Sequence, residues 1–261
     1  MKGKGYVLIT GASKGIGKEL ANIFARHLYS LILVARSEEL LQQMKQEFES
    51  KFSIDVKIFV YDLSDSEQAI GLFDEIKKQN LKVDILINNA GFGMYGEFLE
   101  IDEKSEQQMI HLNIETLTLL SKLFGREMAK NGGGKILNVA STAAFQPGPG
   151  MAVYYATKAY VLSFSEAISY ELRPLGIQVS TLCPGPTDTE FHDRAGTRKS
   201  VIMQKLNMDA ETCASIAYRQ FMKGKRLIIP GLMNKIGVFS TRFMPRPWLL
   251  WVVYQFMKQK K

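Results

Sequence analysis

The sequence has few cysteines and no long apolar run, and both shortages exclude whole classes of protein. Its two cysteines, Cys183 and Cys213, have neither the spacing of a metal site nor the number that a disulfide framework needs. We therefore expect two reduced thiols in a cytoplasmic protein. No stretch approaches the roughly 20 apolar residues of a membrane-spanning helix. The apolar run Tyr6–Ile9 is also too short for a secretory signal, so we expect none.

Acidic residues are scarce in the last quarter of the chain. Residues 1–193 contain 19 Lys/Arg and 24 Asp/Glu (net −5), whereas residues 194–261 contain 14 and 2 (net +12). Such a segment can meet an anionic membrane, an acidic partner or a phosphorylated substrate, or it can be an ordinary solvated surface. Its aromatic residues are not interleaved with the basic ones as in nucleic-acid-binding modules, so we expect no nucleic-acid partner.

Short β-branched runs alternate with longer amphipathic segments along the chain. We expect strands at Tyr6–Thr10, Leu31–Ala35, Val56–Tyr61, Asp84–Asn88, Lys135–Ala140, Gln178–Leu182 and, as a seventh, Leu227–Ile229. We expect helices at Gly15–His27, Glu38–Ser50, after a capping box of Ser64 and Glu67, at Lys104–Ala129 and within Ala152–Pro174.

Strands that are continuous apolar runs separated by helices predict a parallel sheet with helices on both faces. The fold class is therefore α/β, a Rossmann-like doubly wound sheet of about seven strands. No linker or repeat divides the chain, so we expect one domain over residues 1–261. It would include a substrate-loop insertion at about 186–208 and a helical C-terminal extension at about 231–261.

A glycine-rich turn follows the first expected strand and precedes the first expected helix. Glycines permit a tight turn and let the backbone approach a pyrophosphate, while the helix N-terminus offers unpaired N–H groups. A glycine turn alone is weak evidence, but this one has the strand before it and the helix after it that such a site needs. We therefore predict that a dinucleotide contacts Gly11, Ser13, Lys14, Gly15, Ile16 and Gly17.

The end of the second expected strand indicates which dinucleotide binds. An NAD enzyme usually places an acidic residue there to accept the ribose 2′-hydroxyl, but this strand ends in Arg36. Arg36 can pair with a 2′-phosphate, and Lys14 adds a second positive charge at the same end. The alternative is that both are ordinary surface cations. We predict NADP(H) as the cofactor.

Two residues of the expected helix at 152–174 form a candidate proton-transfer pair. Tyr154 and Lys158 are four residues apart, so their side chains lie on one helix face. A nearby ammonium favours phenolate and would lower the pKa of Tyr154. Such spacing is common by chance, but Ser141 ends the fifth expected strand, where active residues of doubly wound sheets gather.

Together these motifs resemble those of the short-chain dehydrogenase/reductase family, over about residues 5–190. Its glycine turn has the same Gly-x-x-x-Gly-x-Gly spacing, and its catalytic Asn, Ser, Tyr and Lys correspond to Asn113, Ser141, Tyr154 and Lys158. The resemblance also implies cofactor contacts at Asp62, Leu63, Asn89, Ala90, Gly91, Tyr154, Lys158, Pro184, Gly185, Thr187 and Thr189. Asn88 is the less certain ligand of its segment, and the family spacing favours Thr189 over Thr187.

The resemblance implies hydride transfer between the nicotinamide and a carbonyl or alcohol, with reduction as the expected direction. Ser141 would hold the substrate oxygen, Tyr154 would deliver the proton, Lys158 would bind the nicotinamide ribose and Asn113 would position a water. The segments Gly91–Phe98, Phe145–Val153 and Phe191–Met208 would line the pocket. Phe92, Met94, Phe145, Met151 and Phe191 in them suggest an apolar substrate, although they are equally ordinary core residues.

Other functions remain open on the sequence alone. One is a 3-oxoacyl thioester reductase of lipid metabolism, and another is a non-catalytic NADP(H)-binding regulator, which would have no need of the Tyr154–Lys158 pair. A nucleotide-sugar epimerase or dehydratase is disfavoured by the length of the chain and by the spacing of its glycines.

The C-terminal extension contains both tryptophans of the chain within the nearly uniform apolar run Trp248–Met257. The run can pack over the substrate pocket, pair with another subunit, or lie at a membrane interface. Packing or subunit contact is the expectation, because apolar helices are usually buried. We also expect a homodimer or homotetramer, with membrane contact through the basic C-terminus as the alternative.

Overall fold

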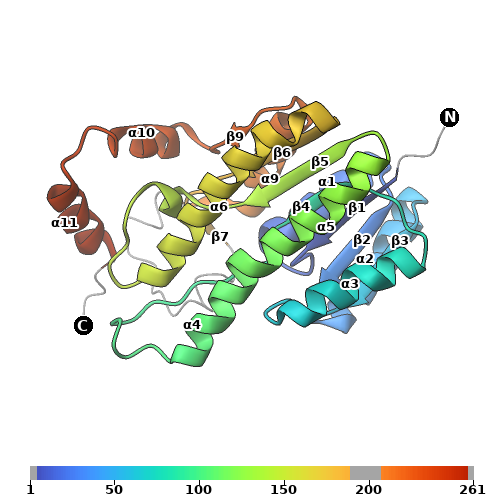
Figure 1. The fold of residues 1–261 in the computed structure, drawn as a ribbon, viewed down its shortest axis with the longest axis horizontal. Helices are drawn as coiled ribbons and strands as arrows, with labels where there is room; N and C mark the ends of the chain where they lie inside the picture. The colour runs from blue at the N-terminus through green and yellow to red at the C-terminus, as the bar shows by residue number, and fades with distance from the viewer. Residues whose placement is uncertain (1–4, 189–206, 258–261) are drawn as a thin grey trace.

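The computed structural model describes residues 5–188 and 207–257. Its centre is a parallel sheet in the order β3-β2-β1-β4-β5-β6-β9 (Figure 1). The strands are β1 (Tyr6–Thr10), β2 (Leu31–Ala35), β3 (Val56–Val60), β4 (Val83–Asn88), β5 (Gly134–Val139), β6 (Ile177–Leu182) and β9 (Leu227–Ile228). The predicted doubly wound parallel sheet is therefore confirmed, including the seventh strand, which pairs in parallel with β6.

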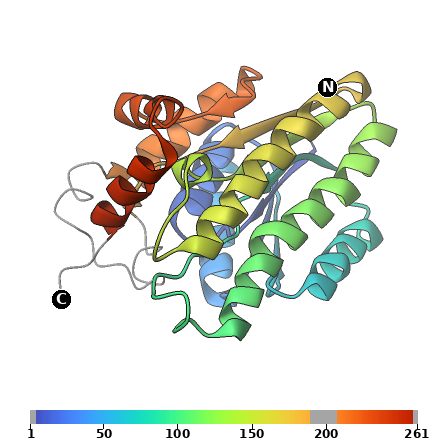
Figure 2. The same cartoon turned by 60° about the vertical axis from the view of Figure 1, so that its left-hand side comes forward.

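Helices cover both faces of this sheet, and Figure 2 shows the layers from a second side. The α-helices of the described residues are α1 (Gly15–Arg26), α2 (Glu38–Phe52), α3 (Ser66–Lys78), α4 (Glu103–Ile110), α5 (Leu117–Lys130), α6 (Ala152–Glu171), α9 (Ala210–Met222), α10 (Leu232–Ser240) and α11 (Arg246–Met257). Short 3-10 turns lie at η2 (Thr142–Phe145) and η3 (Arg173–Leu175). A small second sheet pairs β7 (Thr187–Asp188) with β8 (Met208–Asp209), and it was not predicted.

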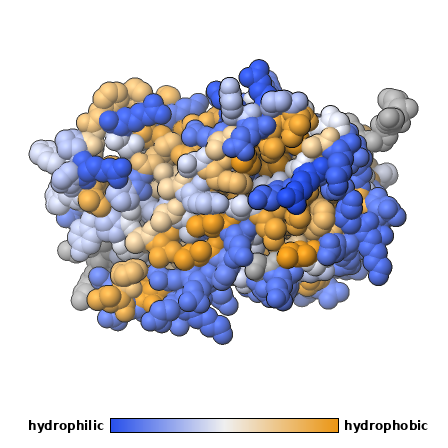
Figure 3. All heavy atoms as spheres, in the orientation of Figure 1, coloured by the Kyte–Doolittle hydropathy of each residue, from blue (hydrophilic) through white to orange (hydrophobic). Residues whose placement is uncertain are grey.

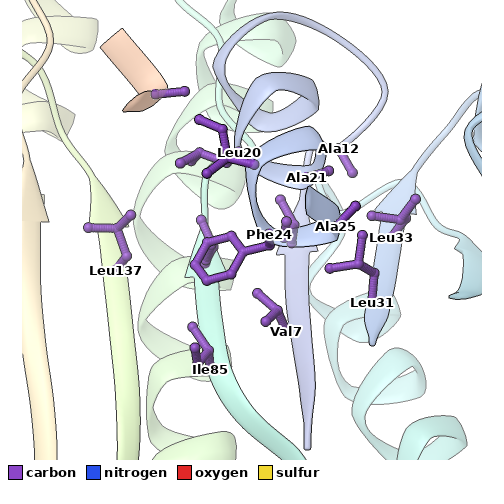
Figure 4. Packing of buried hydrophobic residues seen from close by; sticks show 14 of the residues in the cluster. Val7, Ala12, Leu20, Ala21, Phe24, Ala25, Leu31, Leu33, Ile85 and Leu137 are labelled. Carbon is purple, nitrogen blue, oxygen red and sulfur yellow. The ribbon is translucent and has the colours of Figure 1, made fainter. Parts of the chain in front are cut away.

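The side chains of each strand alternate between the two faces of the sheet, which explains why helices cover both faces. In β1, Val7 and Ile9 pack in one cluster with α1, α2 and α9, whereas Leu8 packs in the other with α3 and α5. Figure 4 shows the first cluster, where Phe24 of α1 lies over the strands close to Val7 and Leu20. Because successive side chains point to opposite faces, continuous apolar strands need a helical layer on each side.

One local expectation was wrong. Asp65, not Ser64, caps α3, because the Asp65 carboxylate accepts from the Glu67 N–H, while the Ser64 hydroxyl donates to Asp62 at 2.7 Å. The long helix expected over Lys104–Ala129 is confirmed as an unbroken helical stretch, but it is not α-helical throughout. A π-helical turn, η1 (His111–Thr116), lies between α4 and α5.

The C-terminal extension forms two helices, α10 and α11, at the end of the molecule farthest from β3. Among the α11 residues whose burial the structure describes (246–255), Leu249 and Val253 are buried and both tryptophans are exposed, so the expected burial of this segment holds there for one face of the helix. No helix among the described residues is long and apolar enough to cross a membrane. Residues 189–206, most of the predicted insertion, lie outside the described part.

Candidate active site

The sheet order changes direction between β1 and β4, so a crevice is expected at the carboxyl ends of these strands. The predicted glycine turn lies there. Gly11 has φ +63° and Gly15 has φ +55°, conformations that favour glycine. A Cβ on Gly17 would lie 2.3 Å from the Gly11 carbonyl oxygen. The conformation and close packing of this turn therefore require glycine at these positions. Without side chains there, the backbone can also approach a ligand closely.

Helix α1 begins directly at this turn, with Lys14 at its N-cap position. The first turn of α1 contains no acidic residue, and Lys14 makes no capping hydrogen bond with its side chain. Free N–H groups and the positive end of the helix dipole therefore face the crevice, as a pyrophosphate requires. Ser13 and Ile16 lie in the same turn, with Ile16 packed against the core.

Asn89 braces the glycine turn from the neighbouring strand. Its side-chain amide donates to the carbonyl oxygens of Thr10 (3.0 Å) and Gly11 (3.1 Å). The Thr10 hydroxyl in turn accepts from the backbone N–H groups of Asn89 and Ala90, both at 3.0 Å. The side chain of Asn89 thus shapes the cofactor turn, and a cofactor contact by this residue stays a prediction.

Arg36 and Asp62 lie where the adenosine end of a dinucleotide is predicted, and they contact each other. An Arg36 guanidinium nitrogen lies 3.5 Å from an Asp62 carboxylate oxygen, and both side chains are about half exposed. A surface pair at this distance contributes little stability, so Arg36 is easily recruited by a phosphate. The Asp62 carboxylate also accepts from Ser64, which together with Arg36 lowers its pKa against the opposing effect of burial.

Leu63 differs from its neighbour because its side chain is buried in the core. Its carbonyl oxygen accepts a hydrogen bond from the Thr116 hydroxyl at 2.7 Å. A cofactor contact at Leu63 would therefore come through the remaining backbone atoms and not the side chain.

Ser141, Tyr154 and Lys158 come together beyond the carboxyl end of β5. Ser141 follows β5 and caps η2 by accepting from the Ala143 N–H at 3.1 Å. Tyr154 and Lys158 lie in the first turns of α6, both buried, and a hydrogen bond joins Tyr154 to Ser141. The Lys158 ammonium donates to the Val139 carbonyl oxygen at 2.9 Å and lies 5.8 Å from the centre of the Tyr154 ring.

The direction of the Tyr154 pKa shift differs from the expectation. Burial raises the pKa of Tyr154 above its ordinary value, and the hydrogen bond with Ser141 opposes this only in part. Burial also lowers the pKa of Lys158 to about 8. The expected lowering of the Tyr154 pKa by Lys158 was therefore wrong for this structure, because desolvation of the phenol dominates. Tyr154 is a protonated phenol at neutral pH.

Asn113 lies in the π-helical turn η1 and is buried beside these residues. Its amide nitrogen donates to the Phe92 carbonyl (2.9 Å) and the Thr157 hydroxyl (3.0 Å), and its oxygen accepts from the Phe92 N–H (3.2 Å). A Cβ on Gly91 would lie 2.9 Å from the Asn113 oxygen and 3.4 Å from the Lys158 ammonium. Asn113 thus fixes the loop after β4 beside Lys158, and π-helical turns often occur at functional sites.

The turn after β6 closes the crevice from the other side. The buried Pro184 and the half-buried Gly185 lie beside Ser141, since the Pro184 carbonyl accepts from the Ser141 hydroxyl at 3.4 Å. Thr187 is buried, and its hydroxyl donates to the Gly185 carbonyl at 3.0 Å. The alternative residue, Thr189, lies outside the described residues.

A buried polar network behind the site was missed by sequence reasoning. The Asn88 amide donates to Ser121 (3.0 Å) and to Asn138 (2.9 Å), and Asn138 donates to Ser165 (2.9 Å). It links α5, β4, β5 and α6. Asn138 and Ser165 have no pattern that distinguishes them from neighbouring residues, but a polar residue inside an otherwise apolar strand was an available signal.

Apolar side chains gather beside Tyr154. Met109, Met151, Phe92 and Met94 pack in one cluster with it, as the predicted pocket lining requires. Phe145 is partly buried and packs against a separate core cluster that contains Val161 and Leu162, so its place in the pocket lining stays a prediction. Phe191 lies outside the described residues.

Comparisons with known proteins agree with this geometry. A family model described as short chain dehydrogenase matches residues 5–200. The 17-beta-hydroxysteroid dehydrogenase type 3 of Mus musculus is 32% identical over 244 residues, 88% of this chain and 76% of that protein. The very-long-chain 3-oxoacyl-CoA reductase of Homo sapiens is 30% identical over 69% of this chain, which spans only 58% of that protein's length. A solved short-chain dehydrogenase from Sphingobium yanoikuyae in complex with NADPH superposes with a TM-score of 0.83 at 29% identity, covering 98% of both chains.

Proposed function

The chain belongs to the short-chain dehydrogenase/reductase family, and on that premise we propose that it is an NADP(H)-dependent oxidoreductase that reduces the carbonyl group of an apolar small molecule. The observation that carries this proposal is the meeting of Ser141, Tyr154 and Lys158 beside the cofactor crevice. The NADPH complex of the similar Sphingobium protein supports the cofactor, and so does Arg36 at the end of β2.

Each residue of the group has one task in this proposal. Ser141 and Tyr154 donate hydrogen bonds to the substrate oxygen, and Tyr154 passes its proton to that oxygen as negative charge develops. Lys158 holds the ribose next to the nicotinamide, and Asn113 keeps the Gly91 loop close enough for the ring to fit. When bound, the nicotinamide supplies the hydride.

The protonation state of Tyr154 suits its proposed role as the proton donor in carbonyl reduction. Burial raises the pKa of this phenol, so it is protonated at neutral pH.

The substrate class rests on the surroundings of Tyr154. Met109, Met151, Phe92 and Met94 offer apolar contacts and few hydrogen-bond partners, so a sugar is a poor fit. Among the relatives, one is named for hydroxysteroids and one for very-long-chain 3-oxoacyl-CoA, both of them substrates with large apolar parts. We therefore propose an apolar ketone, with a 3-oxoacyl thioester as the second candidate.

Two further properties belong to the proposal. We propose that the protein works in the cytoplasm, because Cys183 and Cys213 are free, buried thiols that form no disulfide. We also propose a homodimer or homotetramer of single-domain subunits; light scattering of the purified protein tests the oligomeric state.

Substitution of Tyr154 by Phe tests the proposed chemistry. We expect NADPH oxidation to fall by at least about 100-fold, because the proton donor is lost, while NADPH affinity stays within about twofold. The matched control is Tyr155→Phe, the same change at the next residue, which also lies against the apolar cluster but does not contact Ser141 in the proposal. Near wild-type turnover by Tyr154→Phe would refute the assignment.

A substrate panel separates the two candidate classes. NADPH oxidation should be followed with aldehydes, ketosteroids, sugars and 3-oxoacyl thioesters. We expect the highest kcat/KM with a bulky apolar ketone or an acyl thioester. Turnover of sugars alone would contradict the apolar class, and NADPH binding without turnover of any carbonyl would favour the non-catalytic regulator.

A further inference from the structure

The two C-terminal helices present apolar side chains to solvent in a regular pattern. In α10, Leu232, Met233, Ile236 and Phe239 are each 52–72% exposed and follow one another at the spacing of a single helix face. Phe243, directly after α10, is 73% exposed and packs edge-on against Phe239. A single exposed apolar residue needs no explanation, but a contiguous set indicates a surface that binds something.

Helix α11 continues this surface. Trp248 and Trp251 are 72% and 65% exposed, whereas Leu249 and Val253, four residues apart, are buried on the opposite side. Both helices lie side by side at the same end of the molecule in Figures 1 and 2. In Figure 3 apolar residues at this end of the surface alternate with strongly hydrophilic ones. We call the outer faces of α10 and α11 together the C-terminal face.

The charged residues of the segment that contains the C-terminal face are all of one sign. After Glu211 the chain contains no acidic residue, whereas residues 212–261 contain 10 Lys and Arg. Lys235, Arg242 and Arg246 are exposed on or between the two helices. Residues 1–193, by contrast, have the net charge of −5 given above. An anionic surface would therefore attract this end of the molecule and repel the rest, which fixes an orientation.

We propose that the C-terminal face docks the protein on an anionic lipid bilayer. Apolar and Trp side chains would enter the headgroup boundary, and the Lys and Arg side chains would lie at the phosphates. α11 has 12 residues, too few to cross a bilayer, so the helix lies in the interface. A second copy of the chain fits less well, because two faces of the same positive charge would repel each other.

Docking would also place the candidate active site close to the bilayer. Asn234 on the inner side of α10 lies against the turn after β6, where a Cβ on Gly185 would be 2.3 Å from its side-chain oxygen. If the proposed function holds, an apolar carbonyl compound dissolved in the membrane would have a short path to Tyr154. Only this last consequence rests on the proposed function.

The chain contains its own probe for this test, because its two tryptophans are both in α11. The full-length protein is mixed with vesicles of phosphatidylcholine alone or with about 30% phosphatidylglycerol. We expect flotation with the anionic vesicles, a blue shift of tryptophan emission, and weaker binding as the salt concentration rises. Absence of both flotation and blue shift with anionic vesicles would overturn the proposal.

Two variants separate the apolar and the charged contributions. Trp248→Gln/Trp251→Gln should lower vesicle binding by at least about tenfold, since the apolar anchors are lost. Lys235→Glu/Arg242→Glu/Arg246→Glu should abolish the preference for anionic lipid. The matched control Ile70→Gln/Tyr170→Gln removes two exposed apolar side chains from α3 and α6 and should bind like the wild type. An equal loss in the control would overturn the assignment to this face.

Two readouts distinguish the remaining outcomes. NADPH oxidation with a water-soluble ketone should be unchanged in all three variants, which verifies that they are folded and keeps this test separate from that of Tyr154. A doubled mass in light scattering without lipid, lost in the Trp variant, together with no vesicle binding, would show that a second copy occupies the C-terminal face and would overturn the proposal.

Discussion

Gly17 shows how much the cofactor turn depends on single atoms. Replacement by Ala would place a methyl group 2.3 Å from the Gly11 oxygen and 2.4 Å from the Asn89 amide nitrogen. We expect Gly17→Ala to weaken NADPH binding by at least about tenfold and to lower the free energy of unfolding by about 2 kcal/mol. Fluorescence titration and urea unfolding measure the two effects.

The control for this substitution is Gly237→Ala. Gly237 lies inside α10, and a Cβ there would meet nothing within 4 Å. Because Ala is the better helix former by about 1 kcal/mol, this variant should be as stable as the wild type or slightly more stable. Unchanged NADPH affinity in Gly17→Ala would contradict the role of the turn.

The lowered pKa of Lys158 makes the stability of the folded protein increase with pH. The folded protein loses this proton near its lowered pKa of about 8, whereas the unfolded chain keeps it up to the ordinary value of 10.5. Between these values the unfolded state binds more protons, so the free energy of unfolding rises with pH. The free energy of unfolding of the wild type, relative to that of Lys158→Met, should rise by about 2 kcal/mol between pH 7 and 9.5. Urea unfolding of both proteins at both pH values measures this rise. The same free-energy difference between wild type and variant at pH 7 and pH 9.5 would contradict the prediction.

The sequence predicted which residues come together beside the crevice better than it predicted their pKa values and contacts. The glycine turn and the trio Ser141, Tyr154 and Lys158 were found because their spacing repeats a motif. The raised pKa of Tyr154 was not, since desolvation depends on side chains from distant segments, such as Met109. The Arg36–Asp62 contact was missed for the same reason, because it joins residues 26 positions apart.

Between strands β4 and β5, the Asn88–Asn138 pair holds the elements behind the site together. Asn138→Leu keeps the number and branching of the side-chain heavy atoms but removes a partner of the Asn88 amide and of the Ser165 hydroxyl. Since each buried polar group left unpaired costs about 1–3 kcal/mol, we expect a loss of about 2–4 kcal/mol in urea unfolding. The control Asn131→Ala removes an exposed amide and should cost about 0.5 kcal/mol or less. Equal losses of unfolding free energy in Asn138→Leu and Asn131→Ala would contradict the stabilising role of the buried network.

The seven strands of the main sheet were predicted to within one residue at each end, because a continuous apolar run is a local property of the sequence. The helical boundaries were less accurate. Asp65 and Ser64 are both good caps, and only the fold selects Asp65. The π-helical turn at His111–Thr116 has no signature of its own, because Asn113 is held there by Phe92 and Thr157 from other elements.

At the scale of the whole molecule, cofactor binding should stabilise the fold selectively. NADPH would join the two halves of the sheet across the crevice, and at about 100 times its Kd it adds about 2.7 kcal/mol. For a chain of this size that is a rise in Tm of about 5–10 °C. NADH lacks the phosphate for Arg36 and should give a smaller rise at equal concentration.

Arg36→Leu tests this selectivity. In this variant the rise in Tm with NADPH should fall to nearly the rise with NADH, because only the 2′-phosphate contact is removed. The rise in Tm with NADH should stay as in the wild type. The Arg36–Asp62 pair is half exposed, so its loss alone should hardly change the Tm without cofactor. Differential scanning fluorimetry with both cofactors measures these shifts, and equal responses in the wild type would contradict NADP(H) preference.

The π-helical turn also restricts which insertions and deletions the chain tolerates. A π-helical turn takes up one residue more than the same turn of an α-helix, so deleting one residue from His111–Thr116 would restore a regular helix and leave the faces of α4 and α5 as they are. Asn113 lies inside this turn, and the deletion would remove the wider turn that lets its side chain reach Phe92 and Thr157. The length of this segment is therefore as constrained as the identity of Asn113.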